Sequence, residues 1–240
     1  MRIITNIKNA PRTSGRHRDV ITQPITDSLT SGMYKGKRCF ILGGGPSMKN
    51  LDFTLLQTEI TIGINKALFK YPVMINYSMD EKFYRWIHND TTMLKAFKNF
   101  TGIRVWVSKK GIVYKKDVYV IRRLREKNTI SLDLSSGIWP GNNSGWGALN
   151  LAMALGCNPI YLLGYDLKVT NDETHWHNGY EKTNVDDLSR RLRKYKKLFC
   201  SVSGAIAELG FTVINLNTES ALECFSKQTL QEVLKNSTLS

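Results

Sequence analysis

The chain has 240 residues, of which 42% are hydrophobic and 22% charged, a composition typical of a soluble globular protein with a sizeable core. No run approaches the roughly 18 apolar residues of a membrane-spanning helix, and the N-terminus has no apolar stretch long enough for a signal peptide. The formal net charge is +14, which favours anionic partners such as nucleotides, acidic glycans or nucleic acid.

Residues 1–34 are polar and basic with weak patterning, and we expect them to form a flexible or surface-bound N-terminal arm. In residues 35–240, short apolar runs alternate with helix-like segments, which is typical of a single nucleotide-binding α/β domain with a mainly parallel sheet flanked by helices. The strands expected are Cys39–Leu42, Ile60–Ile64, Met74–Tyr77, Arg104–Val107, Val118–Ile121, Pro159–Leu163 and Thr212–Asn215. The helices expected are Gly145–Leu155, Val185–Leu209 and Leu230–Lys235.

Basic residues gather in two places: nine lie between Arg104 and Lys127, and six more lie between Arg190 and Lys197 on an expected helix. This pattern indicates either an anion-binding surface or a merely solvated basic face. The four cysteines, Cys39, Cys157, Cys200 and Cys224, lie far apart and form no Cys-x-x-Cys pair. Their spacing argues against a zinc cluster or a disulfide framework and indicates a reducing, cytoplasmic location.

The clearest motif follows the strand at 39–42, where Gly43, Gly44, Gly45, Pro46 and Ser47 come in succession. Such a turn lies at the carboxyl edge of the sheet, where α/β folds bind ligands. Glycines permit positive φ angles and a close approach of backbone amides, and Pro46 suits the first position of a helix. We therefore predict that backbone amides of this turn bind a nucleotide or sugar phosphate, the alternative being a tight turn without a ligand.

Polar residues also lie at two other expected junctions between elements. Asn65 follows the strand at 60–64, and Asn142, Asn143, Ser144 and Gly145 open the helix at 145–155, with Ser144 as the expected N-cap. These groups are predicted to contact a sugar or a base, although Asn65 could instead cap the segment that follows it.

Tyr165 and Asp166 follow the strand at 159–163, and the Asp166 carboxylate suits a ribose or sugar hydroxyl. The segment 171–180 contains His175 and His177, each a candidate general base near neutral pH. Metal binding by these histidines with Asp166, Asp172 and Glu173 is a competing interpretation, and a structural role is a third.

Several of these motifs resemble a known family. Gly43-Gly44-Gly45-Pro46-Ser47-Met48 resembles the Gly-x-Gly-Pro-Ser-Leu turn of bacterial lipo-oligosaccharide sialyltransferases. Further similar segments are Gly63–Lys66, Ser144–Gly156, Pro159–Leu167 and Asn217–Leu222. The wider Gly-x-Gly-Pro-Ser family includes 6-hydroxymethylpterin pyrophosphokinase and the motility accessory factor, and phage proteins of this type are similar in layout.

The resemblance spans roughly residues 38–225 and implies a Rossmann-like glycosyltransferase that takes its sugar from a CMP-sugar donor and requires no metal or other cofactor. By the same resemblance, Gly43, Gly45, Ser47 and Asn65 would hold cytidine monophosphate. Ser144 and Gly145 would line the nucleotide, and Asp166 would lie beside the cytidine. A gapless match puts Gly179 where the family has its catalytic histidine, so His177 serves as the base only if the loop is shifted. The acceptor implied by the basic charge is an acidic glycan or modified DNA.

Two alternatives remain open at this point. A pyrophosphokinase-like enzyme would use ATP and Mg²⁺ held by Asp166 with Asp172 or Glu173. A non-enzymatic nucleotide- or nucleic-acid-binding protein would act through its basic surface.

Overall fold

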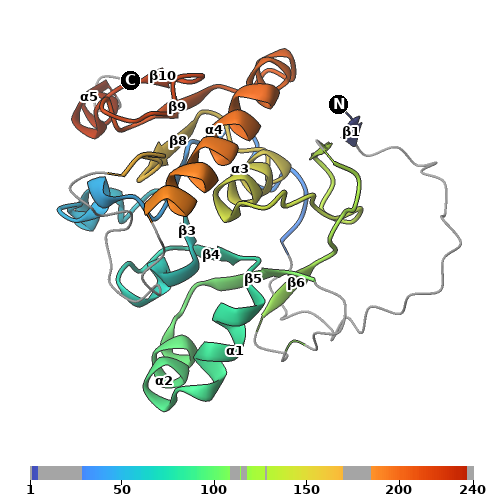
Figure 1. The fold of residues 1–240 in the computed structure, drawn as a ribbon, viewed down its shortest axis with the longest axis vertical. Helices are drawn as coiled ribbons and strands as arrows, with labels where there is room; N and C mark the ends of the chain where they lie inside the picture. The colour runs from blue at the N-terminus through green and yellow to red at the C-terminus, as the bar shows by residue number, and fades with distance from the viewer. Residues whose placement is uncertain are drawn as a thin grey trace, which may run out of the picture. The chain divides into compact units, whose positions relative to one another are not determined.

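The protein is described by a computed structural model (Figure 1), which covers residues 2–4, 29–108, 114, 118–127, 129–169 and 185–236. The chain divides into two compact units, Met1–Lys35 with Ile62–Cys157 and Gly36–Thr61 with Asn158–Ser240. Their strands make up an eight-stranded sheet in which every described pairing is parallel. The predicted α/β fold class with a mainly parallel sheet is thereby confirmed.

The first unit contains strands in the order β3-β4-β5-β6, with bounds Ile60–Ile64, Ile75–Ser78, Ile103–Val107 and Tyr119–Ile121. The first two residues of β3 fall in the second unit. A separate two-stranded sheet pairs β1 (Arg2–Ile4) with β7 (Thr129–Ser131). The helical elements are η3 (Asn65–Phe69), α1 (Glu81–Asn89), α2 (Thr91–Asn99) and α3 (Ser144–Ala154). An aromatic cluster forms much of this unit's core, with Phe83 stacked on Trp106 at a ring-centroid distance of 5.9 Å.

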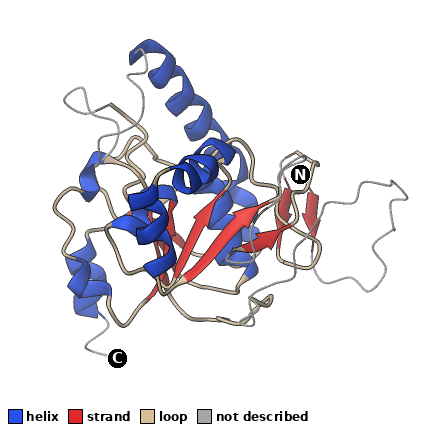
Figure 2. Cartoon of the chain, turned by 90° about the horizontal axis from the view of Figure 1, so that it is seen from below, coloured by secondary structure: helices blue, strands red, loops and turns tan. Residues whose placement is uncertain are grey.

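The second unit contains strands in the order β10-β9-β8-β2, with bounds Ser226–Lys227, Val213–Asn215, Ile160–Leu163 and Cys39–Leu42. Its helical elements are η1 (Pro46–Met48), η2 (Phe53–Leu56), α4 (Val185–Glu208) and α5 (Leu230–Asn236). Figure 2 colours these helices blue and the strands red. Strands β2 and β8 are fully buried along their length, as expected for central strands of a parallel sheet covered on both faces.

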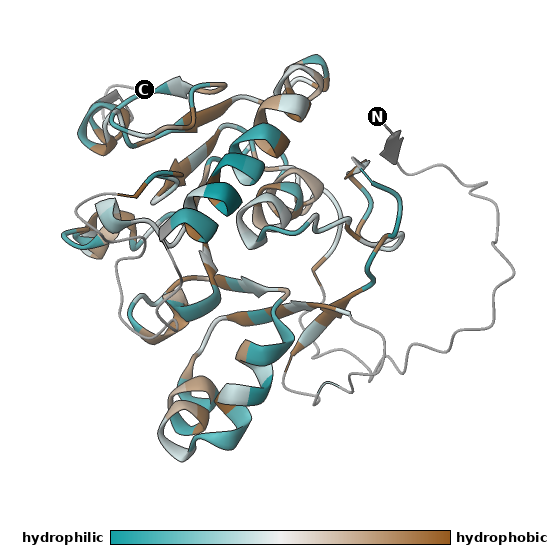
Figure 3. Cartoon of the chain, viewed as in Figure 1, coloured by the Kyte–Doolittle hydropathy of each residue, from teal (hydrophilic) through white to brown (hydrophobic). Residues whose placement is uncertain are grey.

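Two helices contrast in their surroundings. All residues of α3 from Trp146 to Ala154 are buried, so this helix has no solvent-facing side there. Helix α4 is largely hydrophilic in Figure 3, in keeping with its Arg and Lys residues. None of the helices in the described ranges combines the length and apolar character that crossing a membrane requires.

Candidate functional site

The glycine turn after β2 is held closely against the loop after β8. Gly43 N donates a hydrogen bond to Leu163 O at 2.7 Å, and Gly45 N donates to Gly164 O at 2.8 Å. A Cβ atom on Gly45 would lie 2.5 Å from Asp166 Cγ, and one on Gly43 would lie 2.7 Å from Gly164 O. Neither glycine has a positive φ, so close approach between two loops, rather than unusual backbone geometry, is what requires glycine here.

The segment after the turn is shorter than the sequence predicted. Pro46 does occupy the first helical position, with Gly45 as N-cap, but the element is a three-residue 3₁₀ turn rather than an α-helix. The α-helix expected after Pro46 is therefore not formed, and phosphate binding by the amides of this turn stays a prediction.

Asp166 is buried, with 3% of its surface exposed, and its carboxylate faces the turn. Oδ2 accepts a hydrogen bond from Ser47 N at 2.9 Å, and Oδ1 accepts from Ser47 Oγ at 2.5 Å. Oδ1 also accepts from Asn217 Nδ2 at 2.8 Å. The carboxylate thus lies beside the glycine turn and accepts the hydrogen bond of the Ser47 amide, one of the groups predicted to bind a phosphate.

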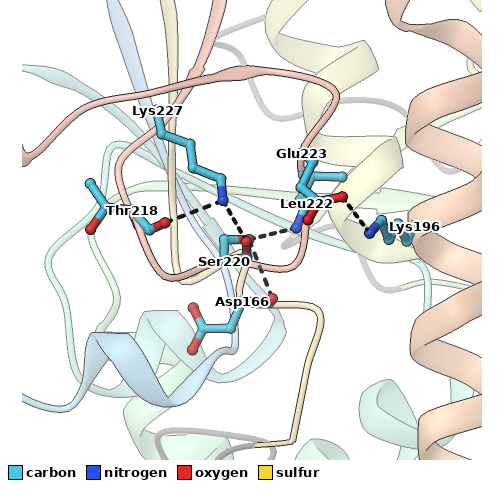
Figure 4. A network of polar contacts seen from close by, with 7 residues as sticks. All are labelled: Asp166, Lys196, Thr218, Ser220, Leu222, Glu223 and Lys227. Carbon is cyan, nitrogen blue, oxygen red and sulfur yellow. Dashed lines mark hydrogen bonds and ion pairs between the residues drawn. The ribbon is translucent and has the colours of Figure 1, made fainter.

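The backbone of the Asp166 loop is fixed as well (Figure 4). Ser220 Oγ donates to Tyr165 O at 2.6 Å, and Ala221 N donates to Asp166 O at 2.9 Å. Ser220 Oγ also donates to Asp166 O at 3.3 Å, as Figure 4 shows. Lys227 Nζ donates to Ser220 O at 2.7 Å and to Thr218 O at 3.2 Å. Three loops, which follow β2, β8 and β9, are therefore joined into one polar cluster, and Asp166 has no freedom to turn without breaking it.

In the first unit, Asn65 follows β3 directly and has a φ of 51°, in the left-handed region. Asparagine tolerates this conformation better than other non-glycine residues. Its Oδ1 accepts a hydrogen bond from Ser78 Oγ at 2.8 Å, and its backbone oxygen accepts from Asn76 Nδ2 at 3.1 Å. Residues in this conformation persist where neighbours hold them, and they cluster at functional sites.

The start of α3 corrects one assignment. Asn143, not Ser144, is the N-cap: its backbone is extended, and its Oδ1 accepts from Gly145 N at 2.6 Å and from Trp146 N at 3.3 Å. Ser144 is already the first helical residue. The Asn143 side chain thus satisfies two amides that the helix leaves without partners, while Asn142 is exposed.

Of the other predicted site residues, Tyr165 is buried, and its ring packs edge-on against Phe199 at 5.8 Å. His175 and His177 lie outside the described residues, as do Asp172 and Glu173 of the competing metal site. The structure thus brings Gly45, Ser47 and Asp166 together in the second unit. In the first unit, Asn65 contacts Ser78, and Asn143 contacts Gly145.

Sequence reasoning missed three polar partners in these clusters: Asn217, Ser78 and Asn76. Each lies in or just after a strand: Asn76 and Ser78 in β4, and Asn217 two residues after β9. Asn76 and Ser78 are fully buried. The sequence feature that could have identified Asn76 and Ser78 is a polar residue in or next to an apolar strand run.

Comparison with solved structures finds similarity to the MAf (motility accessory factor) glycosyltransferase from Magnetospirillum magneticum AMB-1, with a TM-score of 0.47 and 15% sequence identity. The match covers 88% of this chain and 38% of that protein, so the chain spans well under half of its length. No family model and no curated protein matches the sequence.

Proposed function

We propose that the chain is a glycosyltransferase that moves a sugar, of the sialic-acid type, from a nucleotide-sugar donor to an acceptor hydroxyl. The observation that supports it most is Asn65, held in a left-handed conformation at the carboxyl end of β3 by Ser78 and Asn76. Its Oδ1 and backbone oxygen are occupied, while its side-chain Nδ2 donates no hydrogen bond among the described residues. A fixed, half-buried amide donor at that edge suits a nucleoside carbonyl or ring nitrogen.

Asp166 takes a different part in this proposal. A carboxylate repels a phosphate but accepts hydrogen bonds from ribose or sugar hydroxyls. Two of its hydrogen bonds engage Oδ1 and one engages Oδ2, which leaves acceptor capacity on Oδ2. We therefore assign the Asp166 side to a hydroxyl-bearing part of the donor and not to its phosphate.

The reaction would proceed without a metal. His177 or His175 would accept the proton of the acceptor hydroxyl, whose oxygen forms a bond to the anomeric carbon as the bond from that carbon to the phosphate oxygen breaks. The nucleotide leaves with the bonding electron pair, and donors and basic groups around its phosphate stabilise the growing charge. CMP-sugars are the donor class that the motif resemblance implies.

The acceptor is proposed to be acidic, either a glycan or modified DNA. Five basic side chains of α4 are exposed, namely Arg190, Arg191, Arg193, Lys194 and Lys197. All but Arg191 fall on one side of the helix, opposite buried Phe199. Binding by this surface would weaken steeply with salt. Filter binding of single-stranded DNA and of a polysialylated glycan, each at two salt concentrations, separates the two acceptors.

The first experiment is thermal unfolding of the full chain with CMP, CDP, UDP, ATP and GTP, each with Mg²⁺ and with EDTA. A ligand at about a hundred times its Kd adds roughly 2.7 kcal/mol, or several degrees for a chain of this size. A cytidine or uridine nucleotide is expected to stabilise the protein equally in EDTA. A shift confined to ATP or GTP with Mg²⁺ would replace this proposal with the pyrophosphokinase, and no shift at all would leave only a non-enzymatic anion-binding protein.

The matched variant for this experiment is Asn65→Gly, because glycine keeps the left-handed backbone and removes only the side-chain amide. We expect Asn65→Gly to lose most of the nucleotide-dependent shift in unfolding temperature. Asn142→Gly, in the exposed loop before α3, is a second probe of the predicted nucleotide contacts. A full shift in Asn65→Gly would remove Asn65 from the site.

A further inference from the structure

The tertiary fold brings two cysteines together that are 24 positions apart in the sequence. Cys200 lies exposed on α4, and Cys224 lies partly buried just before β10. Two contacts between neighbouring residues position the pair. Lys196 Nζ forms an ion pair with Glu223 Oε2 at 2.9 Å, and the rings of Phe199 and Phe225 pack edge-on with their centroids 6.4 Å apart. Each contact joins a neighbour of Cys200 on α4 to a direct neighbour of Cys224.

The thiols themselves interact. Burial, together with a hydrogen bond with Cys200, raises the pKa of the Cys224 thiol to about 12. The Lys196 ammonium is close enough to both sulfurs to interact with them electrostatically. Cys39 and Cys157, in contrast, are both buried, which leaves them inaccessible to an oxidant.

We propose that Cys200 and Cys224 form a reversible intramolecular disulfide, which makes this pair a redox-modification site that joins α4 to the loop between β9 and β10. That loop also contains Ser220, which contacts the Asp166 backbone. Oxidation would therefore join α4 covalently to a loop whose Ser220 contacts the polar cluster around Asp166. The proposal does not depend on the glycosyltransferase assignment.

The chemistry needs a disulfide oxidant such as glutathione disulfide. The exposed Cys200 thiolate attacks one sulfur of glutathione disulfide, forms a mixed disulfide and releases one glutathione thiolate. The Cys224 thiolate then attacks the Cys200 sulfur, and the second glutathione leaves. Two protein thiols are oxidised, one glutathione disulfide is reduced to two glutathiones, and the two protons end on the released glutathiones.

The test incubates the native full chain with glutathione disulfide, then quenches in acid, alkylates the remaining thiols and analyses intact and protease-digested protein by mass spectrometry. We expect a product that carries only two alkyl groups, on Cys39 and Cys157, and lacks two further hydrogen atoms, with the peptides around Cys200 and Cys224 cross-linked. Addition of dithiothreitol should restore the reduced mass. A stable glutathione adduct on Cys200 in the wild type, or no reaction at either thiol, would overturn the proposal.

Single variants sharpen the test. Cys224→Ser should stop the reaction at the glutathione adduct of Cys200, because the second thiol is missing, and Cys200→Ser should abolish rapid oxidation. Cys157→Ser is the matched control and should form the cross-link as the wild type does. Cross-linking in Cys200→Ser between other cysteines would show that unfolding, and not the native pair, governs the reaction.

Discussion

The Ser47 hydroxyl donates a 2.5 Å hydrogen bond to Asp166 Oδ1, although 119 positions separate the two residues in the sequence. The bond forms because β2 and β8 are adjacent parallel strands, paired from Cys39 with Ile160 to Leu42 with Leu163. Their carboxyl ends coincide, so the two loops that follow them meet. The glycines at 43 and 45 allow the loops to approach, and the carboxylate of Asp166 then holds them together.

Gly45→Ala is expected to destabilise the protein. The new Cβ would lie 2.5 Å from Asp166 Cγ, and three hydrogen bonds prevent that carboxylate from moving away. Overpacking of this kind costs about 1–3 kcal/mol, measurable by urea unfolding. Gly204→Ala in α4 is the control, because a Cβ atom added there would meet nothing within 4 Å, and alanine at that position should add about 0.5–1 kcal/mol. Equal stability of wild type and Gly45→Ala would contradict the close approach.

Asn65→Gly should be more stable than Asn65→Ala, by about 1 kcal/mol. Both variants lose the hydrogen bond from Ser78, but only alanine is strained at a φ of 51°. Chemical denaturation of both variants measures the difference directly. If alanine matched glycine, the left-handed conformation of residue 65 would be excluded.

Tyr77→Phe should leave the stability unchanged or raise it by about 1 kcal/mol, because Tyr77 Oη is fully buried and has no hydrogen-bond partner among the described residues. Gly147→Ala should be strongly destabilising, since its Cβ would lie 1.9 Å from that oxygen. The double variant should lose less stability than the sum of the two single changes, by about 1 kcal/mol or more. Only part of the loss is recovered, because Tyr77 Cζ would remain 2.5 Å from the new Cβ. Strict additivity would show that the two residues are not in contact.

Asp133 should contribute to acid sensitivity. Burial alone would raise its pKa, but hydrogen bonds from Ser136 and Ser135 outweigh that effect and lower the pKa from its ordinary value of 3.8. A lowered folded-state pKa gives stability that is present above pH 3.8 and is lost as the pH falls through the folded-state value. Urea unfolding of Asp133→Asn and of the wild type from pH 7 to pH 3 should show a difference in the free energy of unfolding that narrows below about pH 4. Asp187→Asn, at an exposed position on α4, is the control, and a gap independent of pH would refute the assignment.

Much of the secondary structure was predictable because it depends on short local patterns. Strands 39–42 and 60–64 were predicted with their observed bounds, and the other five differ by one residue at one or both ends. The sequence did not reveal β7, whose only apolar residue is Ile130. Ser131 is tolerated as a buried residue because the Asn150 side chain of α3 satisfies its backbone: Ser131 N donates to Asn150 Oδ1 at 3.2 Å, and Asn150 Nδ2 donates to Ser131 O at 2.7 Å. A strand stabilised by such a tertiary contact leaves no periodic pattern.

The candidate site was predictable only in its parts. The sequence placed Gly43–Ser47, Asn65 and Asp166 after expected strands, where parallel sheets bind ligands. It did not reveal that the Asp166 carboxylate would accept hydrogen bonds from Ser47, because that contact depends on which strand lies next to β2. It also indicated an α-helix after Pro46, where the hydrogen bonds support a single 3₁₀ turn.

The sequence by itself determined the α/β class, the positions of the longer apolar strands and the polar residues that end them, because hydrophobic runs and turn residues act over a few positions. Tertiary structure alone decided which of those residues meet. Strand order joined Ser47 to Asp166, and packing of α4 against the loop before β10 brought Cys200 to Cys224, which the spacing of the cysteines does not indicate. Both contacts join segments distant in sequence, and their formation depends on the burial of whole elements, which no local pattern encodes.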